Sequence, residues 1–290
     1  MRRPARFLQL GVPIRRGFAG LSAAVLLALV AGCATAGTGG TPEETTDVTP
    51  TDTPSTVTVT AYYPIDTRAG FVLARETREV AGTDALTAAV ETLIAGPLDP
   101  DYGAVWNPAT QVLGVTSAAG VITVDLSADA RTANVGSAGA GLMIQALVYT
   151  VTDTAEEPAA SVMMTIDGEP AGELWGAVIW DEPVTRDEPS SVRLLVQIDN
   201  LVEGATVSSP VVVSGEAAVF EAVLHWQVLD ADGAEVASDV TMTAEGQAFA
   251  PYSFEVPLAP GVYTVVITED DPSDGAGGIP MTDSRAITVE

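Results

Sequence analysis

The stretch GTDALTAAVETLIAGP, residues 82–97, contains the clearest helix signal in the sequence and decides the character of the first folded region. Its apolar residues recur at spacings that place them on one helix face: Leu86, Ala89, Val90, Leu93 and Ile94. Thr83 or Asp84 can cap the first turn, and Gly96-Pro97 ends the helix. An apolar face of this kind predicts a sheet for the helix to pack against.

Strand patterns surround this helix. Upstream, residues 56–63 (TVTVTAYY) alternate β-branched and aromatic residues, and residues 71–80 (FVLARETREV) follow as the expected hairpin partner. Downstream, residues 111–116 and 121–126 have the pattern of two more strands, joined by a turn at SAAG.

A second helix is predicted over residues 142–152 (LMIQALVYTVT), after the small-residue stretch GSAGAG. Leu142, Ala146 and Tyr149 fall near one stripe of such a helix. Two valines oppose the prediction because β-branched residues lower helix propensity.

The remaining strands complete an α+β domain. Residues 160–169 alternate apolar and polar positions into an Asp-Gly turn, and residues 171–179 (AGELWGAVI) follow as a short hairpin arm. The order β-β-α-β-β-α-β predicts a mixed sheet with two helices on one face, over residues 56–185. Residues 186–190, at the end of the proline-rich and charged segment DEPVTRDEPS, are predicted to be a linker.

Residues 191–290 show only strand patterns. About seven short strands, separated by Gly, Pro and Asp turns, are typical of an antiparallel sandwich. This part of the chain has no cysteine, so apolar packing alone must hold the two sheets together.

Four short motifs, in this order and spacing, resemble the GerMN domain of sporulation and spore-germination proteins: Gly96-Pro97, Val124-Asp125-Leu126-Ser127, Leu147-Val148-Tyr149-Thr150 and Ile166-Asp167-Gly168. The resemblance covers about residues 56–185. It implies an α+β fold and an association with sporulation, germination or cell-envelope assemblies. It supplies no catalytic residues.

The C-terminal region resembles the immunoglobulin-like domain that accompanies GerMN in bacterial spore-germination proteins. The motifs that carry this resemblance are PVVVSGEA at residues 210–217, Phe220-Glu221, and Val228-Leu229-Asp230 with Gly233. Two folded modules in series are therefore expected.

The N-terminus is predicted to be a signal peptide, residues 1–32. Five arginines and no acid precede an apolar run at residues 18–31, which is shorter than the roughly 20 residues that span a bilayer. Val30-Ala31-Gly32-Cys33 then resembles the lipobox of bacterial lipoproteins, which implies cleavage after Gly32 and a diacylglyceryl group on Cys33. The alternative is an incidental cysteine near an ordinary cleavage site. Cys33 is the only cysteine in the chain.

Residues 33–55 are predicted to be a disordered tether, because Thr, Gly, Pro and acids leave almost no large apolar side chain to bury. The expected location is the extracytoplasmic face of the bacterial cell membrane, with the lipid on Cys33 as the membrane contact. Two acyl chains are enough for stable attachment.

The charge of the chain excludes one class of partner. Removing the signal peptide takes the formal net charge from −27 to −32, and the chain has no lysine. Because phosphate binding needs clustered Arg or Lys, nucleic acid is not expected to bind. The charge leaves basic or neutral partners open, and the resemblance to GerMN implies an envelope protein complex or peptidoglycan.

The residue inventory argues against catalysis. Nucleophilic catalysis needs a base beside the nucleophile, and zinc needs several His or Cys ligands, yet His225 is the only histidine. His225 lies in a strand pattern and is predicted to be structural. Asp230-Ala231-Asp232-Gly233 is predicted to be a hairpin turn and not a calcium loop, and the four tryptophans to be core or edge packing. No metal and no cofactor are predicted.

These observations favour a non-enzymatic, lipid-anchored envelope protein that acts as a binding or scaffold module. The alternative is a peptidoglycan hydrolase that uses paired carboxylates, or an activator of one, since acids are abundant.

Overall fold

The computed structural model describes residues 55–133, 135–270 and 276–290, all within the unit Asp52–Glu290 that the contact pattern defines. The predicted signal peptide, Gly32, Cys33 and residues 33–54 of the predicted tether lie outside the described residues. In the part of the chain that the structure describes, no helix has the length and apolar character needed to cross a membrane.

The first two strands form a long antiparallel ribbon, as predicted. β1 (Thr56–Thr67) pairs with β2 (Gly70–Ala81) along its whole length, from Thr56 opposite Ala81 to Thr67 opposite Gly70. Gly70 has φ +93°, a left-handed conformation that glycine adopts without steric cost and that closes the tight turn.

α1 (Ala85–Ala95) confirms the helix predicted within residues 82–97. Of the two capping candidates, Asp84 is the N-cap: its Oδ1 accepts a hydrogen bond from the backbone N–H of Leu86 at 3.2 Å, and its Oδ2 from the Thr87 hydroxyl at 2.6 Å. Gly96 ends the helix, also as predicted.

The second helix is longer than predicted. α2 spans Ser137–Thr154 and takes in most of the small-residue stretch that precedes residue 142. Almost every residue from Met143 to Thr152 is buried, including Val148 and Val151. A helix that is covered on all sides is stabilised by its packing, which here outweighs the low helix propensity of the two valines.

Four strands form the predicted mixed sheet, in the order β3-β4-β5-β6. β4 and β5 run parallel and are connected through α2, whereas the other two pairs are antiparallel. The strands are β3 (Val112–Ala118), β4 (Val121–Leu126), β5 (Ser161–Ile166) and β6 (Glu169–Pro170). The hairpin arm expected at residues 171–179 becomes a separate small hairpin, β7 (Gly172–Leu174) with β8 (Val178–Trp180).

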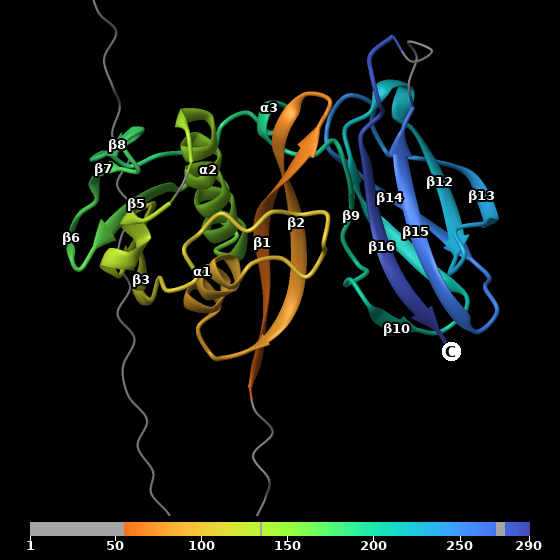
Figure 1. Cartoon of the computed structure of the whole chain (residues 1–290), viewed down its shortest axis with the longest axis horizontal. Helices are drawn as coiled ribbons and strands as arrows, with labels where there is room; N and C mark the ends of the chain where they lie inside the picture. Colours follow the sequence, from red (N-terminus) through yellow and green to blue (C-terminus); the bar gives the residue numbers. More distant parts are fainter. Residues whose placement is uncertain (1–54, 134, 271–275) are drawn as a thin grey trace, which may run out of the picture. The chain divides into compact units, whose positions relative to one another are not determined.

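The α+β fold class is confirmed, with one difference in arrangement. β1 and β2 pair only with each other and do not join the mixed sheet. Both helices contact β1 on one side and strands of the mixed sheet on the other, so that they form a middle layer (Figure 1). The nearly complete burial of α2 is the physical reason, because it needs a cover on two sides.

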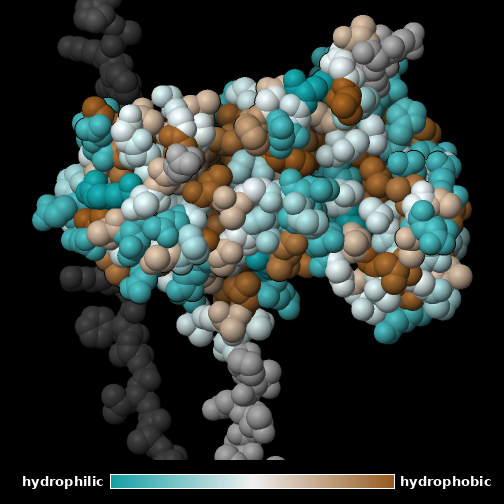
Figure 2. Space-filling model, in the orientation of Figure 1, coloured by the Kyte–Doolittle hydropathy of each residue, from teal (hydrophilic) through white to brown (hydrophobic). Residues whose placement is uncertain are grey.

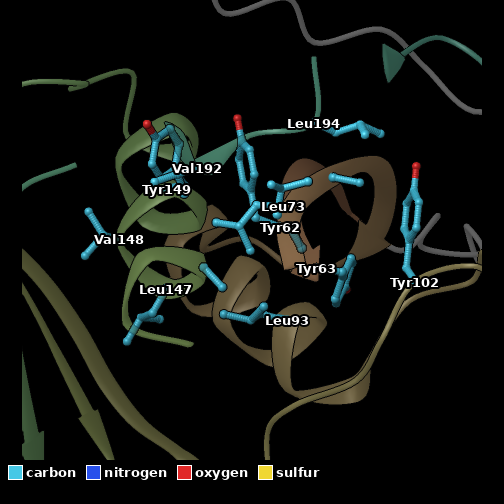
Figure 3. Close-up of a cluster of buried hydrophobic side chains, with 14 of the residues drawn as sticks. Tyr62, Tyr63, Leu73, Leu93, Tyr102, Leu147, Val148, Tyr149, Val192 and Leu194 are labelled. Atoms are coloured by element: carbon cyan, nitrogen blue, oxygen red, sulfur yellow. The ribbon is translucent and has the colours of Figure 1, made fainter. Parts of the chain in front are cut away.

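The core of this domain lies between the ribbon and the two helices. Figure 3 shows Tyr62 of the ribbon beside Tyr149 of α2, in one cluster with Tyr63, Leu73 and Leu93 of α1. The Tyr63 hydroxyl donates to the backbone oxygen of Thr92 at 2.8 Å, which satisfies its one polar atom inside the core.

The C-terminal region is the predicted sandwich of two sheets, but one strand pair is parallel and not antiparallel as predicted, with Ala205 opposite Ile287 and Val207 opposite Val289. One sheet has the order β10-β16-β15-β12-β13 and the other β14-β11-β9. A short helix, α3 (Pro189–Val192), precedes it. The strands are β9 (Val196–Ile198), β10 (Ala205–Val207), β11 (Val211–Ala217), β12 (Val223–Asp230), β13 (Glu235–Met242), β14 (Ala250–Val256), β15 (Gly261–Glu269) and β16 (Thr282–Val289).

Candidate functional site

The described chain contains an apolar groove of about 850 Å³. It lies among four segments: the turn of the β1–β2 ribbon, the loop at residues 101–105, the start of α2, and residues 187–192. Figure 2 shows apolar surface in this area, over the first part of α2 and the neighbouring turn of the ribbon. Its volume lies in the range of about 300–1,000 Å³ that is typical of ligand pockets.

The groove exists because α2 begins with residues that have little or no side chain. Ala138, Gly139 and Gly141 line it. A Cβ atom at Gly139 would lie 3.2 Å from the Cβ of Val135, so this glycine allows close packing. A Cβ at Gly141 would meet nothing within 4 Å, so this glycine leaves space that the protein does not fill. Glycine inside a helix costs about 1 kcal/mol relative to alanine.

Large apolar side chains border this open space. Phe71 is 67% exposed at the tip of the ribbon, and Leu142 and Val105 line the groove as partly buried residues. An exposed phenylalanine beside an apolar hollow is a stronger indication of a binding surface than a single apolar residue on a polar surface. The groove therefore offers an apolar contact surface that no described residue covers.

The charged residues of the groove all carry the same sign. Asp66, Asp101 and Asp187 line it, and no Arg or His is among its described lining residues. Asp66 lies directly opposite Phe71 in the ribbon, which places a carboxylate beside the exposed ring. The carboxylates of Asp66 and Asp187 accept no hydrogen bond from the described chain, whereas Asp101 Oδ2 lies 3.4 Å from the Ser284 hydroxyl.

Hydrogen bonds hold one wall of the groove against α2. Gln145 donates from Nε2 to the backbone oxygen of Thr185 at 3.2 Å and accepts from the backbone N–H of Asp187 at 2.9 Å. The Tyr149 hydroxyl donates to the backbone oxygen of Asp187 at 2.7 Å. Because three bonds fix this short segment, the wall is formed before any ligand binds.

A buried ionic cluster fixes another part of the groove. The Tyr102 hydroxyl donates to Asp283 Oδ1 of β16 at 2.6 Å, and Tyr102 also lines the groove. Arg285 Nη1 lies 2.7 Å from Asp99 Oδ2 and 2.7 Å from Asp283 Oδ1. Asp283 Oδ2 also accepts from the backbone N–H of Ile198 at 2.7 Å. The cluster connects the 99–102 loop to the C-terminal sandwich.

The cluster contains carboxyl groups with perturbed titration. Burial raises the pKa of Asp99 to about 6 and also raises the pKa of Asp283, while the Arg285 guanidinium opposes both shifts. A carboxyl group with a raised pKa can serve as a general acid, but only where it reaches a substrate. Asp99 is 2% exposed and Asp283 3%, so this pair is closed to a polysaccharide.

His225 lies in a strand and the acidic segment at residues 230–233 forms a hairpin turn, both as predicted. His225 is an exposed residue of β12, with Nε2 3.0 Å from Asp270 Oδ1. Asp230 Oδ1 accepts hydrogen bonds from the backbone N–H groups of Asp232 and Ala234, both at 2.9 Å, which is the bonding of a hairpin turn. Within the described ranges, no group of three or more His, Cys, Asp or Glu residues could hold a metal ion.

The tryptophans are packing residues, as predicted. Trp106 and Trp180 are buried, and Trp175 donates from Nε1 to the backbone oxygen of Ala130 at 2.9 Å. Trp226 stacks on Phe254 with ring centroids 4.6 Å apart. None of the four lines the groove.

Sequence analysis missed both the groove and the ionic cluster. One sequence feature marks the groove: the glycines at the start of α2, which the sequence pattern places before the predicted helix and not inside it. The cluster also had a signal: Asp283 and Arg285 share a face with Ile287 and Val289 in an alternating strand, where only apolar residues are expected.

Comparisons with known proteins give two family matches. Residues 60–172 match a family described as sporulation and spore germination, and residues 195–276 match one described as the immunoglobulin-like domain of bacterial spore germination. No curated protein matches the chain.

Two solved structures from Bacillus subtilis are similar to part of the chain. The tandem GerMN domains of the sporulation protein GerM share 22% identity at TM-score 0.39, over 52% of this chain and 51% of that one. The first GerMN domain of GerM shares 21% identity at TM-score 0.34, over 45% of this chain and 96% of that one. The match thus spans about half the length of the tandem structure.

Proposed function

Because this chain joins a domain of the sporulation and spore-germination family to an immunoglobulin-like domain of the bacterial spore-germination family, we propose that it is a non-enzymatic binding protein of the cell envelope. The printed description of each family names a process and no reaction. In this proposal, the pair of domains recognises another envelope component, which is a protein complex or peptidoglycan.

The proposed attachment is a lipid on Cys33, after removal of residues 1–32. The sequence supports it through the basic start, the short apolar run and the lipobox-like motif Val30-Ala31-Gly32-Cys33. Anionic lipid headgroups would repel a mature chain with net charge −32, which is why the proposed membrane contact is a covalent lipid. The folded domains would then work at the extracytoplasmic face.

The observation that carries the proposal is the groove itself. It is open, largely apolar and held in shape by hydrogen bonds at Gln145 and Tyr149, and two of its carboxylates, those of Asp66 and Asp187, accept no hydrogen bond from the described residues. These are properties of a recognition site. A catalytic site would in addition need a nucleophile with its base, or an accessible pair of carboxyl groups with separated pKa values.

Photo-crosslinking in intact cells tests this proposal. The phenylalanine analogue p-benzoyl-phenylalanine replaces Phe71 at the groove or, as a control, Ile179, which is 71% exposed on β8 and outside the groove. We expect an adduct with an envelope component from position 71 and none of the same mass from position 179. Equal adducts from both positions, or none from position 71, would contradict the proposal.

The alternative of peptidoglycan hydrolysis has its own measurement. The carboxyl pair with raised pKa values, Asp99 and Asp283, is sealed by Arg285 and Tyr102. Purified chain incubated with cell-wall material should therefore release no soluble muropeptides. Release that disappears on a single Asp→Asn or Glu→Gln substitution would replace the binding proposal with a hydrolase.

A further inference from the structure

Resting on the binding role proposed above, we infer that the groove takes an extended peptide segment of an envelope protein, one that carries a large apolar side chain next to a lysine or arginine.

The apolar part of the ligand follows from the lining. Phe71, Val105 and Leu142 present apolar surface, and the missing side chain at Gly141 leaves room for one from outside. Burying apolar area from both partners is the main source of affinity in such a site, at roughly 25 cal/mol per Å² before the costs of association. A wholly polar ligand would gain little here.

The cationic part of the ligand follows from the carboxylates. The carboxylates of Asp66 and Asp187 accept no hydrogen bond from the described chain, and the described lining includes no positive charge. A carboxylate beside an apolar wall interacts with a cation more strongly than it does in open solvent. A Lys or Arg next to the large apolar side chain of the ligand would place its positive charge at these two carboxylates.

The chain's own tether does not match this description. Residues 33–54 contain the acids Glu43, Glu44, Asp47 and Asp52, no base and almost no large apolar residue. The groove would repel such a segment. A neutral glycan strand also leaves the carboxylates without a counter-ion, so a peptide of a second protein fits better.

Peptide binding to the full chain, purified in detergent, tests the inference by fluorescence anisotropy. The probes are three labelled short peptides that alternate leucine with lysine, leucine with glutamate, and serine with lysine. We expect saturable binding of the leucine–lysine peptide alone. Equal binding of the serine–lysine peptide would show attraction to the acidic surface without use of the groove, and would overturn the inference, as would binding of the leucine–glutamate peptide.

Two sets of variants locate the binding. Gly141→Leu fills the groove and should weaken binding at least about 10-fold, whereas Gly114→Leu, also at a glycine whose Cβ meets nothing within 4 Å, should not. Asp66→Asn with Asp187→Asn should weaken binding roughly 3- to 10-fold and reduce its salt dependence. The matched control is Asp181→Asn with Asp232→Asn, two exposed acids outside the groove. Circular dichroism checks that each variant folds.

The result separates this inference from the proposed function. If position 71 crosslinks an envelope component but the leucine–lysine peptide does not bind, the ligand chemistry is wrong and the binding role stands. If purified glycan strands displace the peptide and Gly141→Leu blocks them equally, the site recognises glycan and the peptide inference is overturned.

Discussion

Replacing Arg285 with leucine should destabilise the protein strongly, because it leaves two buried carboxyl groups without their cation. Arg285 is 2% exposed and lies 2.7 Å from both Asp99 and Asp283. Its Nη2 also donates to the Tyr102 hydroxyl at 2.9 Å. Breaking a buried ion pair by removing one partner costs about 3–5 kcal/mol.

This cost converts to a large change in melting temperature. For domains of about 150–250 residues, 1 kcal/mol corresponds to about 2–4 °C, so the expected fall is roughly 6–20 °C. Scanning calorimetry at neutral pH measures it. The control is Arg131→Leu, since Arg131 is exposed and donates to the backbone oxygen of Ala171 at 2.8 Å. Equal shifts in the two variants would refute the buried-cluster argument.

The pH dependence gives the same prediction a second test. The folded-state pKa of Asp99 is about 6, above its ordinary value of 3.8, because burial disfavours the charged carboxylate. The protonation of Asp99 therefore stabilises the folded protein fully below about pH 4, and this stabilisation is lost as the pH rises through about 6. Without Arg285, which lowers this pKa, the penalty at high pH grows. The stability difference between Arg285→Leu and the parent should shrink from pH 8 to pH 5; a constant difference would contradict this cause.

Three further predictions concern the anchor, the first helix and the core. Cys33→Ser should move the chain out of the membrane pellet after ultracentrifugation; retention in the pellet would contradict lipid anchoring. Asp84→Ala removes the N-cap of α1 and should lower the free energy of unfolding by about 1 kcal/mol in urea titrations. An unchanged urea midpoint of unfolding would show that Asp84 does not stabilise the helix. Met164→Ala, at a fully buried position of β5, should cost about 2–5 kcal/mol by leaving a cavity; a loss below that of Asp84→Ala would contradict its burial.

Local patterns predicted most of the elements, and the reason is visible in α1. Its apolar face, its N-cap and its terminal glycine all lie within residues 82–97, so no distant contact was needed to identify it. The alternating strands of the C-terminal sandwich were predictable in the same way. The resemblance to the two spore-germination domains is confirmed by the family matches.

The arrangement of the strands and helices in space was harder to predict than the type of each element. The separate β1–β2 ribbon depends on α2 being covered on two sides, which its sequence does not show on its own. The first turn of α2 was missed because Gly139 and Gly141 are poor helix formers, and only packing and the groove explain their place there.

Local sequence patterns could not predict the candidate site, because segments that are far apart in the sequence form it. Asp99 and Arg285 are 186 positions apart, and Tyr102 and Asp283 are 181 apart. The inward position of Arg285 in a strand was the one local sign of the cluster. The groove likewise combines a ribbon turn, a loop and a helix start.

The yield of the crosslink from position 71 in intact cells, compared between the parent, Gly141→Leu and Gly114→Leu, tests the central claim most directly. If the groove is the binding surface, Gly141→Leu abolishes most of the adduct, and Gly114→Leu leaves it unchanged. An adduct that persists at full yield when the groove is filled would contradict the account.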